Sequence, residues 1–210
     1  MTDLMEISAA LQKGRAKVVK ELVEQAIADG MSAKEILDGG LLHGMNIVGA
    51  KFKVNELYVP DVLVAARAMN AGSELLKPLL IEDGVEAAGK VVLGTCKGDL
   101  HDIGKNLVKM MMEGKGLEVI DLGVDVPAEK FVDAAIENEA QIIACSALLT
   151  TTMGEMGNVV KAADEKGVRD KYIIMIGGAP VNESFRESVG ADIYAPDAAS
   201  AADEAIAAIS

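Results

Sequence analysis

Hydrophobic positions in residues 1 to about 80 follow the spacing of α-helices. One stripe recurs at i, i+3, i+4, i+7 and i+8, on Val19, Leu22, Val23, Ala26 and Ile27. Gly30 ends this helix, and Ser32 and Glu35 form a capping box that opens the next, which should run to about Phe52. We expect one helix before these two and a fourth that begins near Pro60. Short connections favour an antiparallel four-helix bundle.

From Lys90 onward, short apolar runs alternate with segments of helical periodicity. The runs are Val91–Gly94, Leu117–Ile120, Ile142–Cys145, Tyr172–Ile176 and Asp192–Tyr194. The helical segments cover about 102–114, 128–138, 152–167, 181–188 and 197–208. Strand followed by helix, five times over, is typical of a doubly wound parallel sheet. We therefore predict an α/β protein with a helical bundle over 1–80, a linker over 81–89 and a five-stranded parallel sheet domain over 90–210.

Charge and composition narrow the function classes. The formal net charge is −13, of which −1 falls on residues 1–80 and −12 on 81–210. An acidic surface repels phosphate groups, so we expect no nucleic-acid partner. No apolar run approaches the roughly 20 residues of a membrane span, and the N-terminus lacks the basic start of a signal peptide. The two cysteines, Cys96 and Cys145, cannot form a disulfide framework, which favours a reducing cytoplasm.

Candidate chemistry gathers where the first predicted strand ends. Ligands of open α/β sheets bind beyond the carboxyl ends of the strands, and the loop after Gly94 contains Asp99, His101 and Gly104. An Asp two residues before a His can accept the hydrogen of one ring nitrogen. This contact fixes the tautomer and raises the basicity of the other nitrogen, as in many metal-bound imidazoles. Such a pair alone is more often a solvated loop histidine than a metal site.

Two further elements follow strands that end at the same edge. Forty-one residues separate Gly104 from Ser146-Ala147-Leu148, which follows the third strand. Another 28 residues lead to Gly177-Gly178, which follows the fourth. This pattern of Asp-x-His-x-x-Gly, Ser-x-Leu and Gly-Gly resembles the cobalamin-binding domains of methyltransferases and mutases.

The resemblance implies roles for individual residues. His101 would be the lower axial ligand of cobalt in place of the cofactor's own base, with Asp99 as its partner. Thr152 would extend this pair with a hydroxyl, and Gly177 and Gly178 would clear space for the buried nucleotide tail. The implied contacts of this domain with the cofactor are Asp99, His101, Asp102, Ile103, Gly104, Ser146, Leu148, Thr150, Thr152, Gly177 and Gly178.

The helices before this domain resemble the cap that covers the cofactor's upper face in cobalamin-dependent methyltransferases. Phe52 and Val59 match the positions that touch that face in the family. An alternative interpretation places Phe52 and Tyr58 in the core of the bundle, because they are the aromatic residues of this half of the chain.

Cap and cofactor domain together make the chain similar to the stand-alone corrinoid protein of multi-component methyltransferase systems, and to the corresponding domains of methionine synthase. Such a protein is a non-catalytic subunit. It accepts a methyl group on cobalt from a substrate-specific methyltransferase and passes it to a second methyltransferase, whose acceptor is tetrahydrofolate or coenzyme M. A reductive activase is a further expected partner. Two alternatives stay open: a cobalamin-binding sensor or regulator, and a flavodoxin-like or receiver-like domain without corrinoid.

Overall fold

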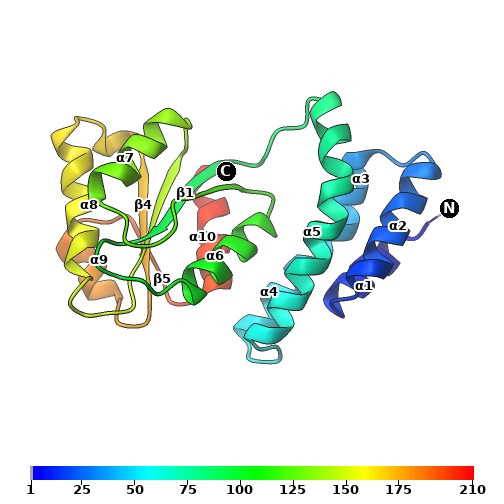
Figure 1. The fold of residues 1–210 in the computed structure, drawn as a ribbon, viewed down its shortest axis with the longest axis horizontal. Coiled ribbons are helices and arrows are strands. Elements are labelled where there is room, and N and C mark those ends of the chain that lie inside the picture. Colours follow the sequence, from blue (N-terminus) through cyan, green and yellow to red (C-terminus); the bar gives the residue numbers. More distant parts are fainter. Residues whose placement is uncertain (1) are drawn as a thin grey trace. The chain divides into compact units, whose positions relative to one another are not determined.

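The computed structural model describes residues 2–210, which form two units (Figure 1). The first comprises the chain up to Ala87 together with Gly114–Gly116, and the second comprises Ala88–Glu113 and Leu117–Ser210. The helices-only pattern of the sequence falls in the first unit, and the alternation of strands and helices falls in the second.

The first unit consists of helices. They are α1 (Leu4–Gln12), α2 (Ala16–Ala28), α3 (Ala33–Ile36), η1 (Leu37–Leu42), α4 (His43–Lys53) and α5 (Val59–Glu82). The predicted capping box is confirmed, because Ser32 Oγ accepts the Glu35 N–H at 3.2 Å while the Glu35 carboxylate accepts the Ser32 N–H at 3.1 Å. Helix α5 extends to Glu82, two residues into the segment expected to be linker.

The third predicted helix runs through α3, η1 and α4, and its middle part, η1, is π-helical. Two glycines lie there, and glycine is a poor helix former. A Cβ on Gly39 would lie 2.8 Å from Leu4 Cδ1, and one on Gly40 would lie 3.1 Å from Ile7 Cγ2. The glycines therefore let α1 pack against this helix at the point where its hydrogen-bond pattern changes.

The second unit contains a five-stranded sheet in the order β2-β1-β3-β4-β5. Every neighbouring pair of strands is parallel, which confirms the predicted sheet. The strands are β1 (Lys90–Thr95), β2 (Glu118–Asp121), β3 (Ile142–Ser146), β4 (Ile173–Gly177) and β5 (Ile193–Ala195). The helices are α6 (Ile103–Glu113), α7 (Ala128–Glu137), α8 (Gly154–Glu165), α9 (Glu183–Val189) and α10 (Ala198–Ile209), with a short 3-10 turn η2 (Arg169–Lys171).

Helices α6 and α10 cover one face of this sheet, and α7, α8 and α9 cover the other (Figure 1). The second face is closed by fully buried side chains such as Phe131 and Met156. A Cβ on Gly94 in β1 would lie 2.9 Å from the Phe131 ring, so this ring fills the place that a larger residue would take. Within residues 2–210, no helix combines the length and apolar character that crossing a membrane requires.

The strand order determines where a ligand can bind. β1 lies between β2 and β3, so the loops after these three strands are neighbours at the carboxyl edge. The connection from β1 leads to β2 on one side and the connection from β3 leads to β4 on the other, and a crevice forms at such a switch point. The loops that carry His101 and Ser146 lie on its two sides.

Candidate functional site

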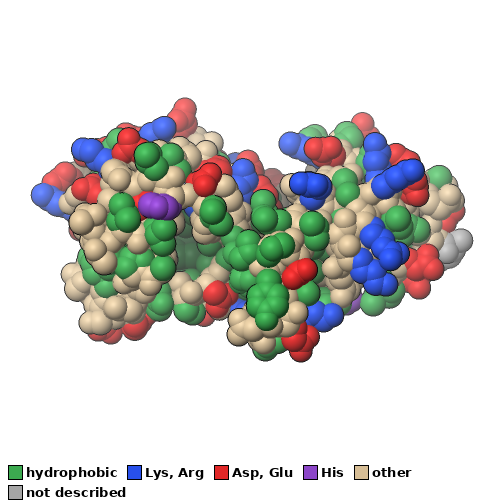
Figure 2. Space-filling view, turned by 60° about the horizontal axis from the view of Figure 1, so that its bottom comes forward, with side chains coloured by type: hydrophobic (Ala, Val, Ile, Leu, Met, Phe, Trp, Pro, Cys, Tyr) green, Lys and Arg blue, Asp and Glu red, His purple; other side chains and the backbone are tan. Residues whose placement is uncertain are grey.

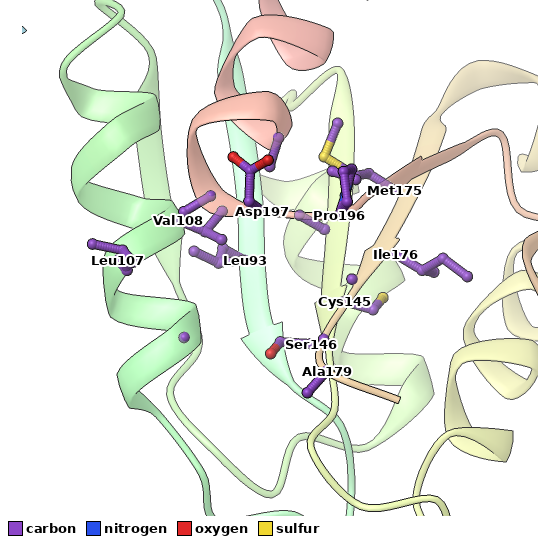
Figure 3. A pocket seen from close by; sticks show the side chains of 17 residues that line it. Leu93, Leu107, Val108, Cys145, Ser146, Met175, Ile176, Ala179, Pro196 and Asp197 are labelled. Carbon is purple, nitrogen blue, oxygen red and sulfur yellow. The ribbon is translucent and has the colours of Figure 1, made fainter. Parts of the chain in front are cut away.

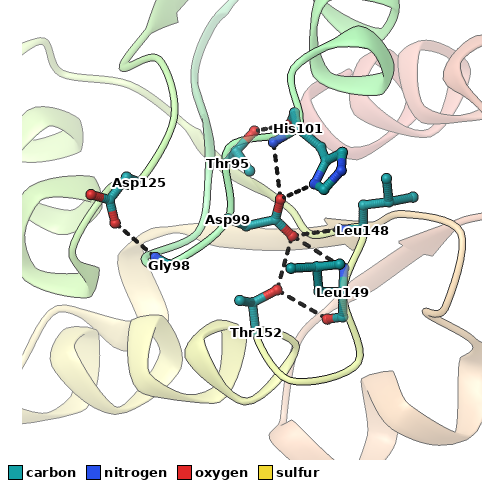
Figure 4. Close-up of polar contacts among 8 residues, drawn as sticks. All are labelled: Thr95, Gly98, Asp99, His101, Asp125, Leu148, Leu149 and Thr152. Carbon is teal, nitrogen blue, oxygen red and sulfur yellow. Dashed lines mark hydrogen bonds and ion pairs between the residues drawn. The ribbon is translucent and has the colours of Figure 1, made fainter.

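His101 lies in the loop that joins β1 to α6 (Figure 4). Its ring nitrogen Nδ1 lies 2.8 Å from Oδ1 of Asp99, which also accepts the backbone N–H of His101 at 3.0 Å. An ionised carboxylate can only accept, so the hydrogen belongs on Nδ1 and the lone pair on Nε2. Because the His101 side chain is 51% exposed, Nε2 is accessible to a ligand.

The second oxygen of Asp99 binds the loop after β3. Oδ2 accepts the N–H groups of Leu148 at 2.8 Å and Leu149 at 3.2 Å, and the hydroxyl of Thr152 at 2.9 Å. Burial alone raises the pKa of the Asp99 carboxyl. The hydrogen bonds from His101, Leu148 and Thr152 outweigh burial and hold this pKa well below its usual range. Asp99 is therefore a buried, fixed negative charge that supports the imidazole and joins two loops.

Large hydrophobic side chains are exposed around this histidine. Leu100 is 72% exposed, Ile103 75% and Leu148 44%. Figure 2 shows a histidine at the surface of the α/β unit with hydrophobic side chains beside it. Exposed apolar groups that surround one polar atom are typical of a ligand surface.

A cavity of about 280 Å³ lies on the face of the sheet covered by α6 and α10 (Figure 3). Ser146, Gly177 and Gly178 lie at the strand ends that border it, and Gly104 contributes from the start of α6. Its walls are mostly apolar or small residues, including Leu93, Leu107, Val108, Ala144, Met175, Ile176, Ala179, Pro196, Ala198 and Ala201. The sequence reasoning missed most of these residues, because they are ordinary core positions of strands and helices.

Backbone packing, in addition to space for a ligand, accounts for the two glycines at the end of β4, Gly177 and Gly178. A Cβ on Gly178 would lie 1.9 Å from the carbonyl oxygen of Ala147, and Gly178 has a φ of +137°. A Cβ on Gly177 would lie 3.3 Å from the carbonyl oxygen of Ala195. The chain's own backbone therefore requires glycine at position 178, while both glycines also line the cavity.

Sequence reasoning also missed two contacts on the other side of the His101 loop. The Gly98 N–H donates to Oδ1 of Asp125 at 2.7 Å, and the Thr95 hydroxyl donates to the His101 carbonyl at 3.0 Å (Figure 4). Neither Asp125 nor Thr95 belongs to a recognised motif, and their distances in sequence from the residues that they contact follow no periodic pattern.

Lys105 is a third residue with an unexpected role. Its side chain is 3% exposed, and Nζ lies 2.6 Å and 2.7 Å from the two carboxylate oxygens of Asp121 and 2.8 Å from Oδ1 of Asn106. Burial raises the pKa of the Asp121 carboxyl, but the hydrogen bonds and charge of Lys105 outweigh it, so this pKa is lowered. The ion pair attaches the first turn of α6 to β2.

The remaining expected contacts lie in three places. Asp102 accepts an N–H of the Asn106 side chain at 3.1 Å at the start of α6, as suits an acid at a helix N-terminus. Thr150 is exposed in the loop after β3. Phe52 and Val59 belong to the helical unit, where both are half-buried.

The structure also places four side chains that are not expected cofactor contacts. Tyr58 is 66% exposed, so the alternative interpretation that places it in the bundle core is wrong. It is the N-cap residue of α5 and lies at the surface. Cys96 and Cys145 are buried free thiols, as expected for small apolar residues. His43 Nδ1 lies 3.1 Å from the buried hydroxyl of Ser8, which makes it a satisfied helix residue.

The site fits the expected corrinoid in its donor and in its shape. An imidazole with a free Nε2 is a suitable ligand for cobalt, and Asp99 orients it as second-layer partners of metal-bound histidines do. The apolar cavity beside Ser146 suits a buried heteroaromatic base, and backbone without side chains at Gly177 and Gly178 borders its entrance.

Comparisons with known proteins agree with this fit. Two family profiles, each described as a B12 binding domain, match residues 89–206 and residues 4–77. The trimethylamine corrinoid protein 1 of Methanosarcina acetivorans is 42% identical over 184 residues, covering 87% of this chain and 85% of that protein.

Two solved structures extend the likeness to the whole fold. A cobalamin-binding protein from Desulfitobacterium hafniense DCB-2 has a TM-score of 0.81 and 34% identity, covering 98% of both chains. A match in the methanol:cobalamin methyltransferase complex MtaBC from Methanosarcina barkeri has a TM-score of 0.86 and 33% identity, covering 97% of this chain and 78% of that chain. The chain therefore belongs to the family of cobalamin-binding corrinoid proteins that serve as methyl carriers in methyltransferase systems.

Proposed function

We propose that this chain receives a methyl group on corrinoid cobalt from a substrate-specific methyltransferase and delivers it to a second methyltransferase. The observation that carries the proposal is the half-exposed His101, whose Nδ1 is held by buried Asp99 so that Nε2 keeps its lone pair for a metal. When bound, the corrinoid supplies a cobalt centre that accepts and releases the methyl group. The protein would supply His101 as the nitrogen ligand, and Asp99 would fix its orientation.

The residues around His101 control that ligand. Asp99 keeps the hydrogen on Nδ1, and its negative charge strengthens Nε2 as a donor. Thr152 and the N–H groups of Leu148 and Leu149 keep Asp99 ionised and in place.

The tail of the corrinoid would enter the cavity beside β3 and β4. Ser146 offers a hydroxyl at the entrance, while Gly104, Gly177 and Gly178 offer side-chain-free backbone. The exposed Ile103 and Leu148 would contact the apolar edge of the macrocycle, with Asp102 and Thr150 at the polar rim.

The helical unit would contact the upper face of the corrinoid through Phe52 and Val59. In support, both side chains are only half-buried within that unit, and Val54 and Tyr58 nearby are 63% and 66% exposed. Transfer to either partner requires the cap to move aside, for which residues 81–89 are the proposed hinge. A cross-link between cap and cofactor domain should abolish transfer; unimpaired transfer would contradict the hinge.

The methyl donor is proposed from chemistry shared with the relatives. The matched proteins are named for trimethylamine and for methanol, and one was solved in a complex with a methyltransferase. A small methylated amine or alcohol, held by a separate methyltransferase, is accordingly the proposed donor. The acceptor methyltransferase uses tetrahydrofolate or coenzyme M, a reductive activase restores the reduced cobalt, and the proposed setting is the cytoplasm.

The test is reconstitution with hydroxocobalamin followed by the visible absorption spectrum. We expect stoichiometric corrinoid in the wild type and a changed spectrum in His101→Ala. The matched control is His43→Asn, since His43 is the other of the two histidines and lies in the helical unit beside Ser8. A colourless wild type would contradict the function, and identical spectra for wild type and His101→Ala would contradict the ligand assignment.

A further inference from the structure

The loop that carries His101 is held from two sides, and only one of them involves the side chain of Asp99. Asp99 and His101 both belong to this loop, so the hydrogen bonds between them move with the loop as a unit. Contacts with other segments determine where the loop lies relative to the sheet. Since β1 lies between β2 and β3, the loop after β1 has one neighbour on each side.

On the β3 side, Asp99 binds the loop that contains Leu148. On the β2 side, the attachment is Asp125, which contacts the His101 loop twice. Its Oδ1 accepts the Gly98 N–H at 2.7 Å, and its own N–H donates to the Asp99 carbonyl at 3.0 Å. Asp125 has a left-handed φ of +55°, a conformation that Asp and Asn adopt more readily than most residues.

Thr95, at the end of β1, provides a second attachment. Its side chain is fully buried, and the hydroxyl donates to the carbonyl of His101 itself at 3.0 Å. Its N–H donates to the Gly123 carbonyl at 2.9 Å, and its carbonyl accepts the Val126 N–H at 3.0 Å. Thr95 therefore links the backbone of the metal ligand to the same segment, Gly123–Val126, that carries Asp125.

We propose that Asp125 and Thr95 are positioning residues for His101, which fix how closely Nε2 can approach the cobalt. The inference rests on the proposed function, because it takes His101 as the axial ligand. Metal coordination depends on donor position within a fraction of an ångström, so loss of either attachment should weaken the bond without removing the ligand.

The experiment compares two pairs of variants loaded with corrinoid. Asp125→Gly removes the acceptor, whereas Asp125→Asn keeps one, and both tolerate a positive φ and remove the same charge. Thr95→Val removes the hydroxyl at nearly constant volume, and Thr95→Ser retains it. The readouts are the nitrogen splitting in the paramagnetic resonance spectrum of the Co(II) form and the Co(II)/Co(I) midpoint potential, with melting of the corrinoid-free proteins to verify folding.

Because Co(I) has no lower ligand, weaker ligation by His101 stabilises it relative to Co(II). We expect about tenfold weaker ligation in Asp125→Gly and Thr95→Val, which corresponds to a potential about 59 mV less negative for a one-electron couple. Asp125→Asn and Thr95→Ser should remain closer to the wild type.

Equal potentials and splittings within both pairs would overturn the inference while leaving the function intact. If Asp125→Gly fails to fold, the Thr95 pair decides by the same measurements. A wild-type Co(II) form without nitrogen splitting would instead contradict His101 as ligand, which is a failure of the proposed function and is seen before any variant is compared.

Discussion

Replacement of Gly178 by alanine should destabilise the α/β unit even when no corrinoid is bound. The added Cβ would lie 1.9 Å from the carbonyl oxygen of Ala147 and 3.0 Å from its carbonyl carbon. Rotation of a side chain cannot relieve this overlap, because both groups are fixed to backbone. The φ of +137° adds strain for any residue with a side chain.

The magnitude follows from the two consequences of this overlap. A residue forced into such a backbone conformation costs about 1–3 kcal/mol. If Ala147 moves away, Leu148 and Leu149 move with it, and the loss of one of their two N–H bonds to Asp99 costs about 1.5–3 kcal/mol. We therefore expect a loss of about 3–6 kcal/mol in the free energy of unfolding, and a melting temperature lower by about 10 °C or more.

The assay is thermal and urea unfolding of the corrinoid-free protein followed by circular dichroism. The control is Gly157→Ala inside α8, where the new Cβ would lie 3.4 Å from Val189 Cγ1, an ordinary contact. There alanine should stabilise the helix by about 0.5–1 kcal/mol. If Gly178→Ala melts at or above the wild-type temperature, the reasoning is refuted, and the glycine would serve the ligand alone.

Three other predictions use the same corrinoid-free unfolding assay. Gly104→Ala should leave stability nearly unchanged, since nothing lies within 4 Å of the new Cβ, but should weaken corrinoid binding in a titration because Gly104 lines the cavity. Thr152→Val should cost about 1–2 kcal/mol by removing a hydrogen bond to buried Asp99, and Thr152→Ser should recover it. Asp121→Asn should lower the free energy of unfolding by about 3 kcal/mol, because it leaves the buried Lys105 charge without its carboxylate partner. Lys105→Met should lower it by less. The folded-state pKa of Asp121 is lowered, so the stability that Asp121 contributes is present above its unfolded pKa of about 4 and is lost as pH falls through the folded value. Between pH 7 and pH 3, the urea midpoint of Lys105→Met should therefore fall less than that of the wild type.

The fold could be predicted because its signals are local and repeated. The third strand was expected over Ile142–Cys145 and extends by one residue to Ser146. The first was expected over Val91–Gly94 and extends by one residue at each end. The differences have one cause, since backbone hydrogen bonds continue past the apolar run into residues whose side chains give no strand signal. The π-helical turn at Gly39 and Gly40 could not be predicted, because it depends on the approach of α1.

The site could be predicted only in part for the same reason. Asp99 and His101 are two residues apart, so their hydrogen bond is a local property of the sequence. Asp125 accepts the N–H of Gly98 in the same loop from 27 residues away, and such an N–H is carried by every non-proline residue. Thr95 is the last residue of an apolar strand, and threonine, like valine, is common in strands, so it gives no signal of a special role. The strand order decides which distant side chains meet, and the residue pattern of a single sequence does not show these pairs.

These long-range contacts give the site its order before any ligand arrives. Asp99, Thr95 and Asp125 bind the His101 loop with hydrogen bonds that involve only the protein. A loop already held in place has little conformational entropy left to lose, so more of the interaction free energy remains for binding the corrinoid. In the proposed function, His101 would hold the cobalt. A loop attached on both sides would then leave movement only to the imidazole side chain, so Nε2 would be presented at the same position each time.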